Sequence, residues 1–151
     1  MDVKSIYEYF LTRISEDASP DGYKRCGKSF YRLSAEGKVG CAIEMQRSSN
    51  NTVGSCSFTF NLACVALYEL RGYGKKTLTR EALRLALRSP DTFIRIGHVS
   101  RRRDYWWEIT EDIMAIYTPS EYYERFIRQD IEKAVLWLRG SAERKKRIYQ
   151  S

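Results

Sequence analysis

Strict alternation of side-chain types over residues 55–64 constrains the fold more than any other feature of this sequence. Within this segment every second side chain is apolar, and the side chains between them are small or polar. The apolar members are Cys56, Phe58, Phe60, Leu62 and Cys64. A period of two is typical of a strand that is buried on one side only, as in an antiparallel sheet. Residues 38–46 alternate in the same way, with Val39, Cys41, Ile43 and Met45 on one face.

Three shorter segments are also predicted to be strands. Ser29 to Leu33 precedes the 38–46 strand, and the turn at residues 35–37 should join the two as a hairpin. Residues 93–99 and 104–109 are predicted to form a second hairpin, closed by an arginine-rich turn. In this second hairpin Ile94 and Ile96 share one face, and Arg95 takes the other.

Apolar residues at helical spacing predict a helix at each end of the chain. The first should run from Val3 to near Ser15, with an apolar stripe along one side. The last begins with Thr118 as N-cap, proline at the first helical position and glutamate at the third, and Gly140 is predicted to be its C-cap. A connecting helix is expected from Arg80 to Arg88, with Thr79 as its N-cap.

These elements predict an α+β domain: an antiparallel sheet of about five strands, with the N-terminal and C-terminal helices packed on one face. The chain has 151 residues, which fits one domain. We expect that domain to span residues 1–139 and to be followed by a basic C-terminal tail, residues 140–151. Residues 139–147, at the start of this tail, hold +4 of the formal net charge of +7.

The compartment is expected to be the cytoplasm. The opening segment MDVKSIYEYF lacks the apolar core of a signal peptide, and no apolar run approaches the roughly 20 residues of a membrane span. In a reducing compartment the four cysteines should be free thiols. They form no CxxC pair, and no histidine stands at ligand spacing from them, so neither a metal nor a cofactor is predicted. We interpret them as small apolar core residues.

Several short motifs occur in a specific order. They are GYKRCGKSFYR (22–32), QRS (46–48), FTFNL (58–62), RIG (95–97) and DYWW (104–107). In this order and spacing the chain resembles the bacterial domain-of-unknown-function family numbered four-three-zero-four, over roughly residues 1–138. The resemblance implies a small cytoplasmic α+β domain and no established activity, so no catalytic residue is carried over. The small one-domain bacterial type also prompts the hypothesis of an immunity- or antitoxin-like role.

Polar and aromatic side chains gather on the side of the predicted strands that faces away from the core. If the strands lie side by side, they would line one open sheet face that grips a polar ligand or a segment of a protein partner. The set consists of Glu44, Gln46, Thr59, Asn61, Arg95, Trp106 and Glu108. The alternative is an ordinary solvated face with cross-strand pairs. Among partners, a protein is favoured and a membrane is not expected.

Nucleic acid is the second hypothesis for the partner. Arginines close to Tyr105 and Trp106 could neutralise phosphates while the rings stack on bases. The basic residues concerned are Arg101, Arg102 and Arg103 in the turn, and Arg144, Lys145, Lys146 and Arg147 in the tail. The sequence contains no recognised nucleic-acid-binding motif.

An enzyme is the third hypothesis, and the sequence favours binding over catalysis. The single histidine, His98, shares the parity of Ile94 and Ile96 and is interpreted as a partly buried structural residue. Glu44 and Glu108 could form an acid/base pair of carboxylates on the open sheet face. The glycine-containing segment at 72–77 does not have the spacing of a phosphate loop and is interpreted as a basic loop.

Overall fold

The fold is an antiparallel sheet flanked by helices. The structure, a computed structural model, describes residues 2–49, 51–52 and 54–150. Within them, the strands are β1 (Lys24–Cys26), β2 (Ser29–Leu33), β3 (Val39–Arg47), β4 (Ser55–Ala66), β5 (Phe93–Arg95) and β6 (Trp107–Thr110). The α-helices are α1 (Val3–Ala18), α2 (Arg80–Ala86), α3 (Ile96–Ser100), α4 (Glu111–Ile116), α5 (Pro119–Tyr122) and α6 (Arg128–Gln150). Short 3-10 turns lie at Ser19–Asp21 and Leu67–Glu69. The α+β class and the antiparallel sheet predicted from the alternation are therefore confirmed.

The strands follow the order β1-β2-β3-β4-β5, and β6 also pairs with β4. Because β3 occupies one edge of β4, β5 and β6 lie one after the other on its other edge. The prediction that residues 93–99 and 104–109 form a hairpin is therefore wrong. β5 ends at Arg95, and α3 with the loop after it leads the chain into β6, which runs in the same direction as β5 along β4. There the α-carbon of Gly97 packs so closely that an added Cβ would lie 2.3 Å from the Arg103 carbonyl oxygen.

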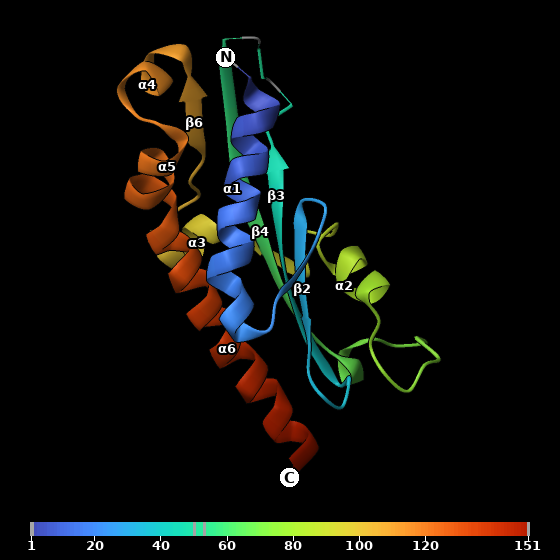
Figure 1. Ribbon diagram of the computed structural model, residues 1–151. Coiled ribbons are helices and arrows are strands. Elements are labelled where there is room, and N and C mark those ends of the chain that lie inside the picture. Colours follow the sequence, from blue (N-terminus) through green and yellow to red (C-terminus); the bar gives the residue numbers. More distant parts are fainter. Residues whose placement is uncertain (1, 50, 53, 151) are drawn as a thin grey trace.

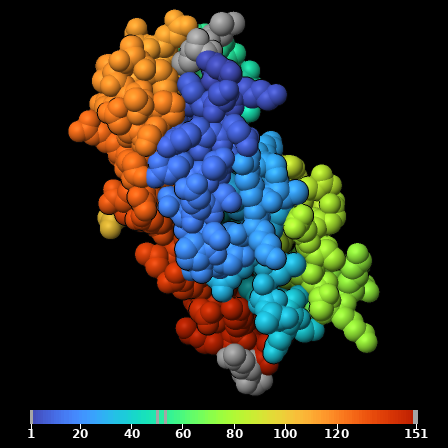
Figure 2. Space-filling model, in the orientation of Figure 1, coloured from blue at the N-terminus to red at the C-terminus, as the bar shows by residue number. Residues whose placement is uncertain are grey.

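One face of the sheet forms the main core together with the two terminal helices (Figure 1). The alternating apolar side chains of β3 and β4 point into it, as predicted. Phe58 is fully buried and packs against Phe10 of α1 and Trp107 of β6, with ring centroids 5.7 and 5.8 Å apart. Figure 2 shows α1 in blue and the segments after β6 in orange to red, side by side over this face.

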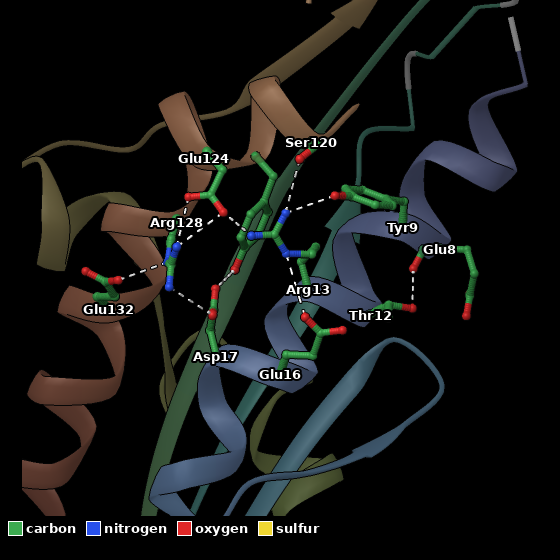
Figure 3. A network of polar contacts seen from close by, with 11 residues as sticks. Glu8, Tyr9, Thr12, Arg13, Glu16, Asp17, Ser120, Glu124, Arg128 and Glu132 are labelled. Carbon is green, nitrogen blue, oxygen red and sulfur yellow. Dashed lines mark hydrogen bonds and ion pairs between the residues drawn. The ribbon is translucent and has the colours of Figure 1, made fainter. Parts of the chain in front are cut away.

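Charged side chains join α1 to the helical segments that follow β6 (Figure 3). Arg13 pairs with Glu124, and its guanidinium carbon lies 4.7 Å from the centre of the Tyr123 ring. The Tyr123 hydroxyl donates to Asp17 over 2.6 Å, and Asp17 also pairs with Arg128 at 3.5 Å. These contacts join residues more than a hundred positions apart, so they hold the first helix against the last.

The C-terminal helical region begins as predicted and ends later. The hydroxyl of Thr118 accepts from the Glu121 amide, and the Glu121 carboxylate accepts from the Thr118 amide, which forms the predicted capping box. A π-helical turn (Tyr123–Ile127) separates α5 from α6. The prediction of Gly140 as C-cap is wrong, because α6 continues through it to Gln150. Ser141 and Ala142 are buried beyond that point, which makes continued helix favourable.

The second face of the sheet is covered in part by α2. Thr79 is its N-cap, as predicted, and accepts from the Ala82 amide. Leu83 packs on this face, and Gly40 of β3 makes room for it, since a Cβ there would lie 2.9 Å from the leucine side chain. Glu44, one of the polar side chains predicted to face away from the core, lies on this face and pairs with Arg88 just after this helix. Among the described residues, no helix is both long enough and apolar enough to span a membrane.

Candidate functional site

The strand register sets polar side chains of β2, β3, β4 and β5 in a single row on the second face. Ser29 stands opposite Glu44, Glu44 opposite Asn61, and Asn61 opposite Arg95. Gln46 stands opposite Thr59 in the next row. The structure therefore brings five of the residues singled out in the sequence onto neighbouring strands, and we call Ser29, Glu44, Asn61 and Arg95 the polar row.

Glu44 is a buried carboxylate at the centre of this row, with 2 % of its surface exposed. The Ser29 hydroxyl donates to one carboxylate oxygen over 2.5 Å. Arg88, just beyond α2, forms an ion pair with the other oxygen while half of its own side chain stays in solvent. The negative charge is thus paired and hydrogen-bonded, which is what makes a buried carboxylate tolerable.

Asn61 and Thr59 are buried as well, so the second face is less open than expected. The Asn61 amide nitrogen donates to the Gln46 side-chain oxygen over 2.8 Å. The Thr59 hydroxyl donates to the carbonyl oxygen of Tyr105 over 2.7 Å. The face consists of a buried polar floor and a partly exposed rim formed by Gln46, Arg95 and Trp106.

Asp104 holds Arg95 and Trp106 together at the rim. Its carboxylate accepts from the Trp106 indole nitrogen over 3.2 Å and lies 3.5 Å from the Arg95 guanidinium. The guanidinium carbon of Arg95 lies 4.9 Å from the centre of the Trp106 ring, in cation–π range. An arginine beside an indole offers both a planar donor fork and stacking area.

Two buried polar atoms in this row lack a hydrogen-bond partner within the described part of the chain. They are the side-chain oxygen of Asn61 and the Nε of Arg95. The two residues are direct neighbours across β4 and β5. One atom is an acceptor and the other a donor, so a single group carrying both an N–H and an oxygen matches them.

Glu108 lies apart from this row and near the other end of β4. It stands opposite Ser57 and accepts from the Ser55 hydroxyl over 2.9 Å. Ser57 is separated from Asn61 by four positions, which is about 13 Å along a strand. The paired carboxylates of glycosidases lie about 5 to 9.5 Å apart, so the register does not bring Glu44 and Glu108 together as such a pair.

His98 is exposed on α3, and the prediction of a partly buried position is also wrong. That prediction assumed the period of a strand. In a helix, His98 no longer shares a face with Ile96, which is fully buried.

The basic residues considered for nucleic-acid binding fall into two separate groups. In the turn, Arg101 pairs with Asp130 at 2.9 Å and stacks on Tyr105, whereas Arg102 and Arg103 are exposed. Along α6, Lys145 and Lys146 pair with Glu69 and Glu143, Arg144 donates to the Ser141 hydroxyl, and Arg147 is exposed. Asp130 and Lys145 are about 22 Å apart along the helix.

Sequence reasoning missed three members of this site: Ser29, Arg88 and Asp104. Ser29 could have been found, because the hairpin register places it opposite Glu44. Arg88 could not, since its contact with Glu44 depends on how α2 crosses the sheet. Asp104 was expected within a strand, but β6 begins only at Trp107.

A comparison with known families matches one model, described as "Domain of unknown function (DUF4304)", to residues 14–140. The match covers β1 to β6, the polar row, the last turn of α1 and the first part of α6. No curated protein and no solved structure matches the chain.

Proposed function

The chain belongs to the DUF4304 family, a domain of unknown function, and from that premise we propose that it is a non-catalytic binding module for a protein partner. Its recognition surface consists of the polar row and its rim, Gln46, Arg95 and Trp106. The partner contributes an extended segment that carries a carboxylate. An immunity- or antitoxin-like pairing is the specific form of this proposal, and a cytoplasmic location is consistent with it.

One observation carries the proposal: the acceptor of Asn61 lies next to the donor of Arg95, and neither has a hydrogen-bond partner among the residues that the structure describes. A buried polar group without a partner costs about 1–3 kcal/mol, and such groups in a folded protein call for an explanation. A small rotation of the partly exposed Arg95 side chain would open both atoms to an incoming peptide group. The N–H and C=O of a peptide backbone supply the matching donor and acceptor.

The rim favours a protein segment of acidic character. Arg95 can bind a carboxylate through two parallel hydrogen bonds, and Trp106 can pack on the apolar part of the segment. The net charge of +7 would attract an acidic partner over a longer range. Nucleic acid is the second hypothesis, but four of its seven basic residues already have partners within the chain.

The proposal is tested by capture followed by titration. The tagged chain is incubated with an extract of its own cells, with and without nuclease, and the retained protein is identified and purified. Its affinity is then measured for the wild type, Trp106→Ala and Arg95→Lys. Loss of the Trp106 contact is expected to weaken binding roughly thirtyfold, equivalent to about 2 kcal/mol. Arg95→Lys keeps the positive charge but loses the planar pair of guanidinium donors, so this variant should also bind the partner more weakly than the wild type.

Arg103→Ala is the matched control, because Arg103 is an exposed arginine of the same segment outside the polar row. It should bind the partner like the wild type, and melting curves should show all variants folded. Equal affinity of Trp106→Ala and the wild type would reject the proposed surface. Material that is lost on nuclease treatment and weakened by Arg103→Ala would favour the nucleic-acid hypothesis instead.

A further inference from the structure

Two cysteines that are distant in the sequence face each other across β3 and β4. Cys41 stands directly opposite Cys64, and their sulfur atoms are 3.6 Å apart, with one thiol donating to the other. The remaining thiols lie elsewhere: Cys26 is exposed on β1 and Cys56 is buried near the start of β4. Residues 41 and 64 therefore form a pair of neighbouring thiols that no sequence motif predicts.

The hydrogen-bond pattern shows that the two backbones are close together at this position. The Leu67 amide donates to the Lys38 carbonyl, so residues 38 and 67 form a hydrogen-bonded pair. Pair types alternate along an antiparallel ladder, and Cys41 and Cys64 lie three positions further on, at a non-hydrogen-bonded pair. Such pairs have α-carbons about 4.5 Å apart, within the range of about 4.4–6.8 Å found in disulfides.

One thiol can be reached from outside, and the other is protected. Cys41 is buried, with 1 % of its surface exposed. Cys64 lines two open cavities, of about 460 and 320 Å³, at the edge of the sheet beyond β5. Lys145 borders both cavities, and its ammonium group donates to the Cys64 carbonyl oxygen over 2.8 Å. A small reagent can therefore approach Cys64 first, beside a positive charge.

The surroundings of Cys41 favour its thiolate. The hydrogen bond with Cys64 lowers the pKa of Cys41, and the charges of Arg32 and Lys146 act in the same direction, against the opposing effect of burial. The same bond raises the pKa of Cys64, which keeps the shared proton. The pair can thus supply a thiolate, the form that reacts in disulfide exchange.

The geometry points to a dithiol–disulfide site at Cys41 and Cys64, with small disulfides such as glutathione disulfide as its oxidising substrates. Cys64 passes its proton to the neighbouring Cys41 sulfur, and the resulting Cys64 thiolate attacks one sulfur of glutathione disulfide, which forms a mixed disulfide and releases one glutathione thiolate that then takes up the proton from Cys41. The Cys41 sulfur then attacks the Cys64 sulfur and releases the second glutathione. The two protein thiols lose two electrons and two protons, which are recovered in the two glutathione thiols.

The test uses the full chain, folded, in buffer containing glutathione disulfide. The wild type is expected to lose the mass of two hydrogens, and digestion should yield a peptide cross-linked between Cys41 and Cys64. Cys26→Ser should behave in the same way, because it removes only the exposed thiol on β1. Cys64→Ser should give no cross-link. The oxidised chain should melt roughly 5–10 °C higher than the reduced chain, because the bond restricts the unfolded state.

A second probe, phenylarsine oxide, bridges two neighbouring thiols with the release of water. The reduced wild type and Cys26→Ser should each bind one equivalent, and Cys64→Ser should bind none. A chain that carries glutathione on Cys26 alone, or that binds the arsenical without Cys64, would overturn the assignment. This site is on the core side of the sheet, so its failure would leave the proposed recognition surface untouched.

Discussion

Glu44 depends on Arg88 for the pairing of its buried charge. The carboxylate is almost fully buried, and Arg88 is its only ionic partner within the described residues. Arg88→Ala should therefore lower the free energy of unfolding by about 1–3 kcal/mol, the cost of leaving a buried group without its partner. Urea unfolding at neutral pH measures this change.

Arg84→Ala provides the matched control for that measurement. Arg84 lies one helical turn earlier and pairs with Glu81, but more than half of each side chain is exposed. Exposed pairs contribute little, so the loss should stay below about 1 kcal/mol. Equal effects of the two substitutions would show that Arg88 contributes only as a surface charge.

The buried hydroxyl of Tyr7 makes the folded chain lose stability as the pH becomes alkaline. Burial raises the pKa of Tyr7 to about 12, so the unfolded chain loses this proton first, from about pH 10 upward. The contribution of Tyr7 is fully present below pH 10 and is lost as pH rises toward 12. Tyr7→Phe removes this dependence. Between neutral pH and about pH 11, the variant should gain about 1 kcal/mol relative to the wild type.

Urea unfolding at both pH values measures the gain, with Tyr68→Phe as control. Tyr68 is about half exposed, at 46 %. Its substitution controls for the loss of one phenol at a site that solvent already reaches. A constant difference between Tyr7→Phe and the wild type would show that the Tyr7 phenol is not held in its neutral form by the fold.

The short helix α3 depends on the absence of a side chain at Gly97. An added Cβ would meet the Arg103 carbonyl oxygen at 2.3 Å and the Tyr105 nitrogen at 2.6 Å, both of them backbone atoms. Gly97→Ala should therefore destabilise the chain by more than about 3 kcal/mol, since neither atom can move without shifting β6. Thermal melting should show a large drop in Tm.

Gly140→Ala is the opposite case on α6. There an added Cβ meets only the end of the flexible Arg144 side chain, at 3.4 Å. Alanine in a helix interior is better than glycine by about 0.5–1 kcal/mol, so Tm should rise. A fall in Tm with Gly140→Ala would indicate that α6 does not continue through this position.

Elements that keep a periodic pattern over many residues could be predicted from the sequence, and short elements could not. β3, β4, α1 and α6 each keep one period over many residues, so their type is encoded locally. Residues 96–100 fit either period equally well. The close approach at Gly97 that makes them helical is a tertiary contact. The helix does not end at Gly140, because burial of Ser141 and Ala142 in a continued helix stabilises α6 more than the glycine favours a C-cap.

At the scale of the whole molecule, contacts hold the helical regions near the two ends of the chain to each other and to the sheet. Arg13, Asp17 and Tyr123 link α1 to the region after β6, and Lys145 ties α6 to the last residues of β4. Lys145 donates to the Cys64 carbonyl, and its partner Glu69 accepts from the Ala66 amide. The edge of β4 beyond β5 is thereby blocked by side chains instead of a further strand.

The sequence predicted which side of the sheet the residues of the candidate recognition surface occupy, but not how deeply they are buried. Strand parity correctly put Glu44, Gln46, Thr59, Asn61 and Arg95 on one side of the sheet. Their burial depends on Arg88 and on the segment at 104–106, whose positions follow from long-range packing. The Cys41–Cys64 pair was hidden for the same reason, because only the register of β3 on β4 brings the thiols together.

The joining of the two chain ends also has a consequence for biosynthesis. A ribosome releases α1 and the β1–β4 meander well before α6, so the nascent chain carries an apolar sheet face that only α1 covers. Domains in this state expose surface on which aggregation begins. The face is shielded only after α6, which begins at Arg128, has been synthesised. A ribosome that stalls before that point would leave a chain whose exposed apolar surface chaperones recognise.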